Sequence, residues 1–172
     1  KYLTYEHSFL FVNTPTDKKA FKTSMGMAFM YSPFFFVTHG YAVLFSDEPA
    51  TGFTEPYHVG ILVGTLFYAF LGLLYTRKIL LEYFSELVVS YTLIGISLGS
   101  NMFYYIVSDS GMSHVYSFCL IAMAIYYIIQ WYNKSTVPLS CVVGTLIGLI
   151  VLVRPTNVLI ISRNFKLPCL TC

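Results

Sequence analysis

Four polar residues stand at the ends of apolar stretches of the sequence, and their side chains suit chemistry on a charged substrate. Asp109 and His114 flank a short loop, and Arg154 and Asn157 follow the last long apolar run. Carboxylate and imidazole groups take up and release protons, so we predict Asp109 and His114 as catalytic residues. The guanidinium group of Arg is a planar fork that binds phosphate through two hydrogen bonds. Arg154 and Asn157 are therefore predicted to bind the substrate.

Each of these residues also has an ordinary structural explanation. A loop Asp is usually solvated, and an Arg at a helix end usually extends toward lipid phosphates. No group of His, Cys and Asp residues has the spacing of metal ligands, so no metal site is predicted. Cys169 and Cys172 form a CxxC pair without a second pair to complete a site. The sequence also lacks the glycine patterns of nucleotide-binding loops.

The elements that must position these residues are strongly apolar. Only 10% of the 172 residues are charged, where soluble domains have about 25%. Too few charges remain for a water-facing surface, and a net charge of +2 without a basic patch does not indicate nucleic-acid binding. We therefore expect the lipid bilayer, and no nucleic acid, as a partner. Five stretches are long enough to span its hydrocarbon core, which takes about 20 apolar residues. These uncharged stretches are 23–46, 56–76, 87–108, 110–133 and 135–153.

The sequence predicts an all-α fold, a polytopic transmembrane helix bundle with four spans and one kinked juxtamembrane helix. Pro33 interrupts the first apolar stretch, and a proline inside a helix removes a hydrogen bond and bends the helix. That stretch is expected to lie on the outer surface. Gly60 and Gly64 have the GxxxG spacing of closely packed membrane helices, which we interpret as packing alone. The predicted segments are an outer loop segment at 1–23, the juxtamembrane helix at 24–45, a membrane bundle at 57–161 with spans at 57–76, 87–107, 113–132 and 138–157, and an irregular tail at 162–172.

The orientation follows from the basic residues in short loops, which favour the cytoplasmic side. Arg77, Lys78 and Lys134 mark that side, and the loop with Asp109 has no Lys or Arg. With four alternating spans, Arg154 then lies at the outer end of the last one. This arrangement predicts that Asp109, His114, Arg154 and Asn157 lie at one level near the outer interface.

Two segments of the sequence resemble a known family. Residues 111–118 read GMSHVYSF, and residues 154–157 read RPTN. Together with the order of the apolar stretches, they resemble the N-terminal half of membrane glycosyltransferases of the GT-C superfamily. Bacterial members akin to protein O-mannosyltransferases and lipid A aminoarabinose transferases are the most similar in pattern. On this resemblance the chain is expected to be a fragment of a larger protein.

The resemblance implies transfer of a sugar from a polyprenyl-phosphate carrier to an acceptor at the outer face of the bacterial inner membrane. It places Asp109 at the second acidic position of such enzymes and Arg154 where the carrier phosphate is met. An Arg or a divalent metal would stabilise the leaving phosphate. The acidic residue expected after a first span is absent, and neither Glu6 nor Asp17 matches its position. The chain by itself is therefore predicted to be inactive.

Two other classes of protein remain open. A transporter or flippase-like protein also has Gly-rich helices, a broken helix and polar groups inside the membrane. Its polar groups would gather near the middle of the bilayer, whereas those predicted here gather at the ends of the spans. A structural or assembly subunit without catalytic activity is the third class, and nothing in the sequence excludes it.

Overall fold

A computed structural model describes residues 11–13, 19–21, 24–45, 52 and 54–159. Helices make up nearly all of this part, and the predicted all-α class is confirmed. A short antiparallel pair of strands precedes them, with Phe11 opposite Phe21, where the sequence predicted only a loop. The elements are β1 (Phe11–Asn13), β2 (Lys19–Phe21), α1 (Met25–Phe45), α2 (Glu55–Leu80), α3 (Glu86–Gly99), α4 (Met102–Val107), α5 (Ser113–Asn133), α6 (Val137–Val153) and the 3-10 turn η2 (Pro155–Asn157).

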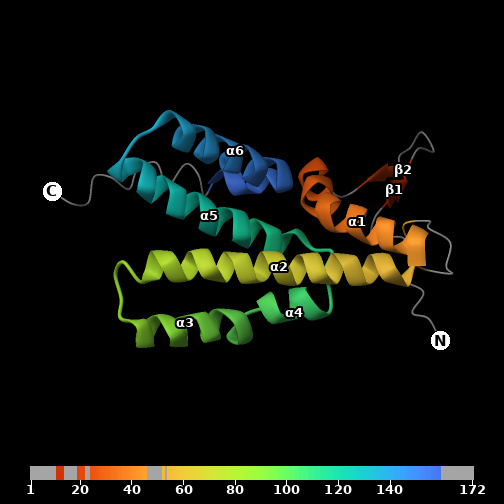
Figure 1. Cartoon of the computed structure of the whole chain (residues 1–172), viewed down its shortest axis with the longest axis horizontal. Coiled ribbons are helices and arrows are strands. Elements are labelled where there is room, and N and C mark those ends of the chain that lie inside the picture. Colours follow the sequence, from red (N-terminus) through yellow and green to blue (C-terminus); the bar gives the residue numbers. More distant parts are fainter. Residues whose placement is uncertain (1–10, 14–18, 22–23, 46–51, 53, 160–172) are drawn as a thin grey trace.

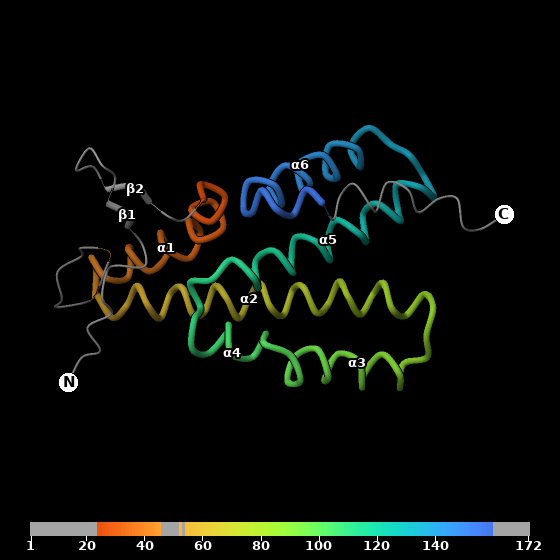
Figure 2. The backbone as a smooth tube through the Cα atoms, turned by 180° about the vertical axis from the view of Figure 1, so that it is seen from behind, coloured from red at the N-terminus to blue at the C-terminus, as the bar shows by residue number. Residues whose placement is uncertain are grey.

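Helix α2 is the central element of the bundle. Figures 1 and 2 show α3 and α4 along one side of it, and α1, α5 and α6 along the other. Helices α2 and α5 run in the same direction and make the most extensive contact, while α3 and α6 run in the opposite direction. The core lies where the start of α1 meets α5 and α6. Its buried members are Met27, Met30, Tyr116, Leu120, Ala124, Leu146, Ile150 and Val153.

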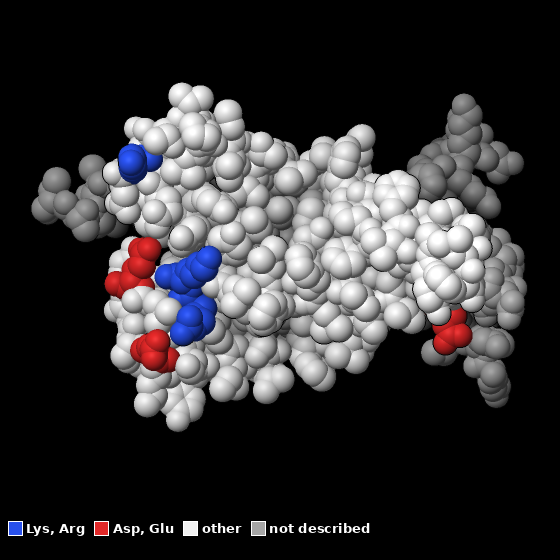
Figure 3. Space-filling model, viewed as in Figure 1, with Lys and Arg blue, Asp and Glu red and all other residues white. Residues whose placement is uncertain are grey.

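Three helices are long and apolar enough to cross a membrane, namely α1, α2 and α5. Glu55 begins α2, and the next charged residue in this helix is Arg77. At a rise of 1.5 Å per residue the uncharged length between them is about 33 Å, close to the roughly 30 Å of the hydrocarbon core. The face drawn in Figure 3 agrees with this apolar length, because its charges gather at the two ends of the bundle and the surface between them carries none.

The predicted span at 87–107 is wrong as a single helix. Helix α3 ends at Gly99, and α4 starts again at Met102. Ser100 has an extended backbone, and its hydroxyl oxygen accepts a hydrogen bond from the Met102 N–H. Ser and Asn side chains compete with the helix for backbone groups, and Gly adds conformational freedom. The sequence Gly99-Ser100-Asn101 therefore breaks the helix despite its apolar surroundings.

The predicted span at 138–157 also ends early. Helix α6 stops at Val153 and has 17 residues. Pro155 disfavours helical geometry in the residue before it, and Arg154 accordingly has an extended backbone with φ −148° and ψ 112°. Arg154 thus lies between α6 and η2 in extended backbone, and Asn157 ends the short 3-10 turn η2.

Helix α1 passes through Pro33 as one continuous helix, and Figures 1 and 2 show that it is bent. Pro33 has no N–H to donate to the carbonyl of Phe29, four residues earlier. The hydroxyl of Ser32 donates to that carbonyl at 2.8 Å instead. The bend agrees with the predicted kinked helix at 24–45. By length and composition, however, α1 meets the same requirement for crossing as α2 and α5.

The Gly60/Gly64 pair packs as predicted. A Cβ at Gly60 would overlap the side chain of Thr38, and one at Gly64 would lie 2.9 Å from the ring of Phe34, both on α1. The predicted irregular tail, most of the predicted outer loop segment and the Cys169/Cys172 pair lie outside the described residues.

Candidate functional site

The side chains of His114 and Arg154 meet where α5 begins and α6 ends. Arg154 Nη1 lies 3.1 Å from His114 Nδ1, and both residues are partly buried. A guanidinium group only donates hydrogen bonds. His114 Nδ1 is therefore the acceptor, and the neutral ring carries its proton on Nε2. The ring of Tyr105 stacks on that of His114, with centroids 4.4 Å apart and an angle of 19° between the planes.

The turn after α6 brings the remaining predicted binding residue to the same place. Pro155 starts the turn η2, which the Asn157 N–H closes by donating to the Arg154 carbonyl at 2.9 Å. The Asn157 side-chain amide is buried and donates to the hydroxyl of Ser117 on α5 at 3.2 Å. Pro155 thus turns the chain so that Arg154 and Asn157 lie beside the N-terminal end of α5.

Asp109 lies in the loop between α4 and α5, where its carbonyl accepts the Met112 N–H at 3.0 Å. Its carboxylate interacts electrostatically with His114 and with Tyr31 of α1. The structure therefore brings Asp109, His114, Arg154 and Asn157 into one region, which we call the polar cluster.

Hydrogen bonds from neighbouring helices fix the loop that carries Asp109. The buried hydroxyl of Thr65 on α2 lies 2.8 Å from the Ser110 carbonyl and 2.8 Å from the hydroxyl of Tyr116. The hydroxyl of Tyr31 on α1 donates to the carbonyl of Gly111. Helices α1 and α2 thus hold two adjacent carbonyls of this loop.

The charge of Arg154 has no acidic partner within hydrogen-bonding distance in the described part of the chain. There, the structure has one salt bridge, in which Arg77 Nη2 lies 3.6 Å from Glu86 Oε1. A charged side chain among apolar helices is costly and usually pairs with an opposite charge. Arg154 contacts a neutral imidazole instead, which leaves it ready to bind an anion.

The level of the polar cluster differs from the predicted position near the outer interface. Thr65, which contacts the loop, is ten residues after Glu55 and twelve before Arg77. These separations correspond to about 15 Å and 18 Å along α2. The cluster therefore lies beside the middle of α2, because α5 begins and α6 ends there.

The residues that support the cluster were not predicted from the sequence. Ser117, Thr65, Tyr31 and Tyr105 all contact it or its loop. Thr65 offered a weak signal, since it is a polar residue in an apolar stretch directly after Gly64. The tyrosines offered none, because the sequence has 15 of them.

The donor set does not suit a zinc ion. Asp109 and His114 are potential ligands, but no group of three His, Cys, Asp or Glu side chains gathers anywhere in the described residues. A zinc site takes three or four ligands of this kind. We therefore assign no zinc to the polar cluster.

Comparisons with known proteins give no family or relative for this chain. No family model matches it, and neither the curated proteins nor the solved structures include a match. The functional argument therefore rests on the residues and their geometry.

Replacing Thr65 with Val should destabilise the protein by about 1–2 kcal/mol, because the Ser110 carbonyl and the Tyr116 hydroxyl lose their partner while the shape is kept. Thermal unfolding in detergent measures this loss. Thr145→Val is the matched control, since Thr145 is exposed and bonds only to Cys141 of its own helix. Equal unfolding temperatures for the two variants would contradict the proposed anchoring of the loop.

Proposed function

We propose that this chain belongs to a membrane glycosyltransferase that takes a sugar from a polyprenyl-phosphate carrier, and that Arg154 holds the carrier phosphate. The observation that carries the proposal is the Arg154–His114 contact, because no carboxylate among the described residues pairs with this Arg charge inside an apolar bundle. A lipid-linked phosphate supplies the missing anion and reaches the site from the bilayer. Arg binds phosphate bidentately, which fixes its orientation as well as its charge.

The neighbouring residues suit the remaining chemistry. During transfer, the bond between the sugar and the phosphate oxygen breaks, and a new bond forms between the sugar and an acceptor hydroxyl. Asp109 takes the proton of that hydroxyl as a general base. Arg154 binds the negative charge that develops on the leaving phosphate. His114 keeps its Nε2 proton on the side of the ring away from Arg154 and can donate it to another polar group of the substrate.

The proposed orientation follows from the charged ends of α2. Arg77 and Lys78 end this helix and favour the cytoplasmic side. The start of α2 at Glu55 then faces outward, and the polar cluster opens toward the outer half of a bacterial inner membrane. In that half, α1 and α2 extend beyond the level at which α5 begins.

A transporter or flippase for a lipid-linked phosphate is the second candidate. The level of the polar cluster favours it, since Thr65 lies near the middle of the uncharged part of α2. Transporters bind their substrates at such a level. A transporter would need Arg154 to bind the lipid phosphate, but it would not need a general base.

The two candidates differ in the effect of Asp109→Asn. The full-length protein is placed in vesicles and supplied with a radiolabelled polyprenyl-phosphate sugar and with extracts that contain acceptors. A glycosyltransferase should transfer the label, and Asp109→Asn should slow transfer by about 100-fold or more because the base is lost. Movement of the lipid across the vesicle membrane without transfer of the sugar, unchanged by Asp109→Asn, would reject the glycosyltransferase and support the flippase.

A further inference from the structure

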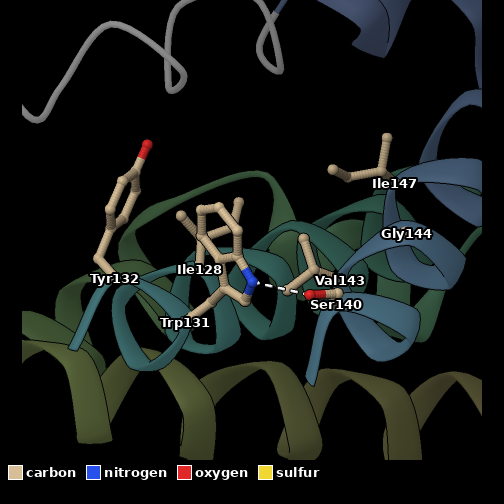
Figure 4. A pocket seen from close by; sticks show the side chains of 7 residues that line it. All are labelled: Ile128, Trp131, Tyr132, Ser140, Val143, Gly144 and Ile147. Atoms are coloured by element: carbon tan, nitrogen blue, oxygen red, sulfur yellow. Dashed lines mark hydrogen bonds between the residues drawn. The ribbon is translucent and has the colours of Figure 1, made fainter. Parts of the chain in front are cut away.

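A second feature of the bundle lies far from the polar cluster, at the end where α5 and α6 are joined. There the two helices leave a cavity of about 200 Å³ between them. Figure 4 shows its lining side chains, which come from both helices. We call this cavity the α5–α6 slot, and it is lined by Ile128, Trp131, Tyr132, Ser140, Val143, Gly144 and Ile147.

We propose that the α5–α6 slot binds one acyl chain of an anionic glycerophospholipid and that Lys134 binds its phosphate. Apolar cavities of about 150 Å³ already hold a molecule such as benzene, so the slot has room for part of an acyl chain. From Ser140 to Ile147 it extends about 10 Å along α6. An acyl chain entering beside the helices would run in this direction.

The polarity of the slot matches that of a phospholipid. Its polar groups lie at the end of the bundle, where Trp131 Nε1 donates to the hydroxyl of Ser140 at 2.9 Å (Figure 4). Deeper in the slot, Val143, Gly144 and Ile147 are apolar. Trp and Tyr are typical of the boundary between headgroups and acyl chains, and Trp131 and Tyr132 occupy that boundary here.

Lys134 supplies the charge that selects an anionic headgroup. It follows α5 directly, three residues after Trp131. The other basic residues described at this end already have partners, because Arg77 pairs with Glu86 and Lys78 lies over the ring of Tyr75 at 5.0 Å. Lys134 has neither a carboxylate nor a ring partner within the described residues. Its exposed ammonium group is therefore free for a lipid phosphate.

Gly144 gives the slot its depth. A Cβ at this position would meet nothing within 4 Å, and the same is true of Gly148 one turn further along α6. Gly144 lines the slot, whereas Gly148 does not. Because an added Cβ has open space at both positions, Leu at position 144 should extend into the slot, and Leu at position 148 is the matched control.

Trp131, the only Trp in the sequence, reports directly on the slot. The chain is reconstituted in phosphatidylcholine vesicles that contain a small fraction of phosphatidylglycerol with brominated acyl chains, which quench Trp fluorescence on contact. We expect more quenching than from the same fraction of brominated phosphatidylcholine. Gly144→Leu should abolish the excess, and Lys134→Gln should lower the apparent association constant about fivefold. Gly148→Leu and Arg77→Gln should behave as the wild type.

Three results would overturn the proposal. Equal quenching by the two brominated lipids would show that the slot does not select an anionic headgroup. Unchanged excess quenching in Gly144→Leu would show that the chain binds elsewhere. If the wild type formed dimers that lost the quenching, and if Gly144→Leu separated these dimers, the slot would belong to a contact with a second copy of the chain. Lys134→Gln alters an exposed residue, so it tests the charge even if the Gly144 variant folds poorly.

Discussion

Replacing Arg154 with Gln should weaken the binding of a polyprenyl phosphate by about 30-fold or more, because truncating one partner of a desolvated charge pair costs about 2 kcal/mol or more. Arg154→Lys keeps the charge but loses the planar fork. Its binding should therefore be intermediate, about tenfold weaker than that of the wild type. Neither variant removes a salt bridge to a carboxylate in the described residues, so the fold should tolerate both.

Titration of the protein in detergent with the purified lipid phosphate, followed by native mass spectrometry, measures these affinities. Arg77→Gln is the matched control, since it removes one Arg charge near the C-terminal end of α2, away from the polar cluster. A general attraction of the protein for anions would weaken equally in the Arg77 and Arg154 variants. That result, or wild-type affinity in Arg154→Gln, would remove the basis of the proposed phosphate site.

The second large effect concerns the contact between α1 and α6, which lies directly before Arg154 in the chain. A Cβ at Gly26 of α1 would lie 2.6 Å from the carbonyl oxygen of Leu152 and would overlap the backbone of Val153. Backbone atoms cannot move aside as a flexible side chain can. Gly26→Ala should therefore separate α1 from α6 and destabilise the protein by about 1–3 kcal/mol. The hydroxyl of Ser24, which donates to the Val153 carbonyl at 2.7 Å, would lose its partner as well.

Gly148→Ala provides the comparison for this prediction. Both positions are helical, but Gly148 has nothing within 4 Å of an added Cβ. The gain in helix propensity, up to about 1 kcal/mol, should make Gly148→Ala neutral or stabilising. The two unfolding temperatures in detergent should consequently move in opposite directions. Equal shifts would contradict the close approach of α1 and α6.

Much of the fold follows from the distribution of charge in the sequence. The uncharged stretches correspond to helices because apolar backbone in a bilayer must satisfy its own hydrogen bonds. The breaks were harder to predict, since Gly99-Ser100-Asn101 and Arg154-Pro155 lie inside uncharged or nearly uncharged runs. Hydropathy averages over about 20 residues and does not register such local backbone preferences. The 26-residue length of α2 was also missed, because the charges of Arg77 and Lys78 do not end a helix.

The sequence led to the members of the polar cluster but not to its support or its depth. His114 and Arg154 were predicted to share a level from the order of the helices alone. Their contact depends on Pro155, which turns the chain after α6. The position of the cluster along α2 depends on where α5 begins beside α2. The contact between Thr65 and Tyr116 determines that position. Such packing between distant segments leaves no pattern in a single sequence.

Crosslinking tests the phosphate site most directly. A polyprenyl phosphate with a photoreactive group beside its phosphate is bound to the protein, irradiated and located by peptide sequencing. We predict that the label lies on residues 113–118 at the start of α5 and on residues 154–157, and that excess unlabelled lipid phosphate prevents it. Labelling confined to other segments, such as the α5–α6 slot, or labelling that unlabelled lipid does not prevent, would contradict the assignment of a phosphate to Arg154.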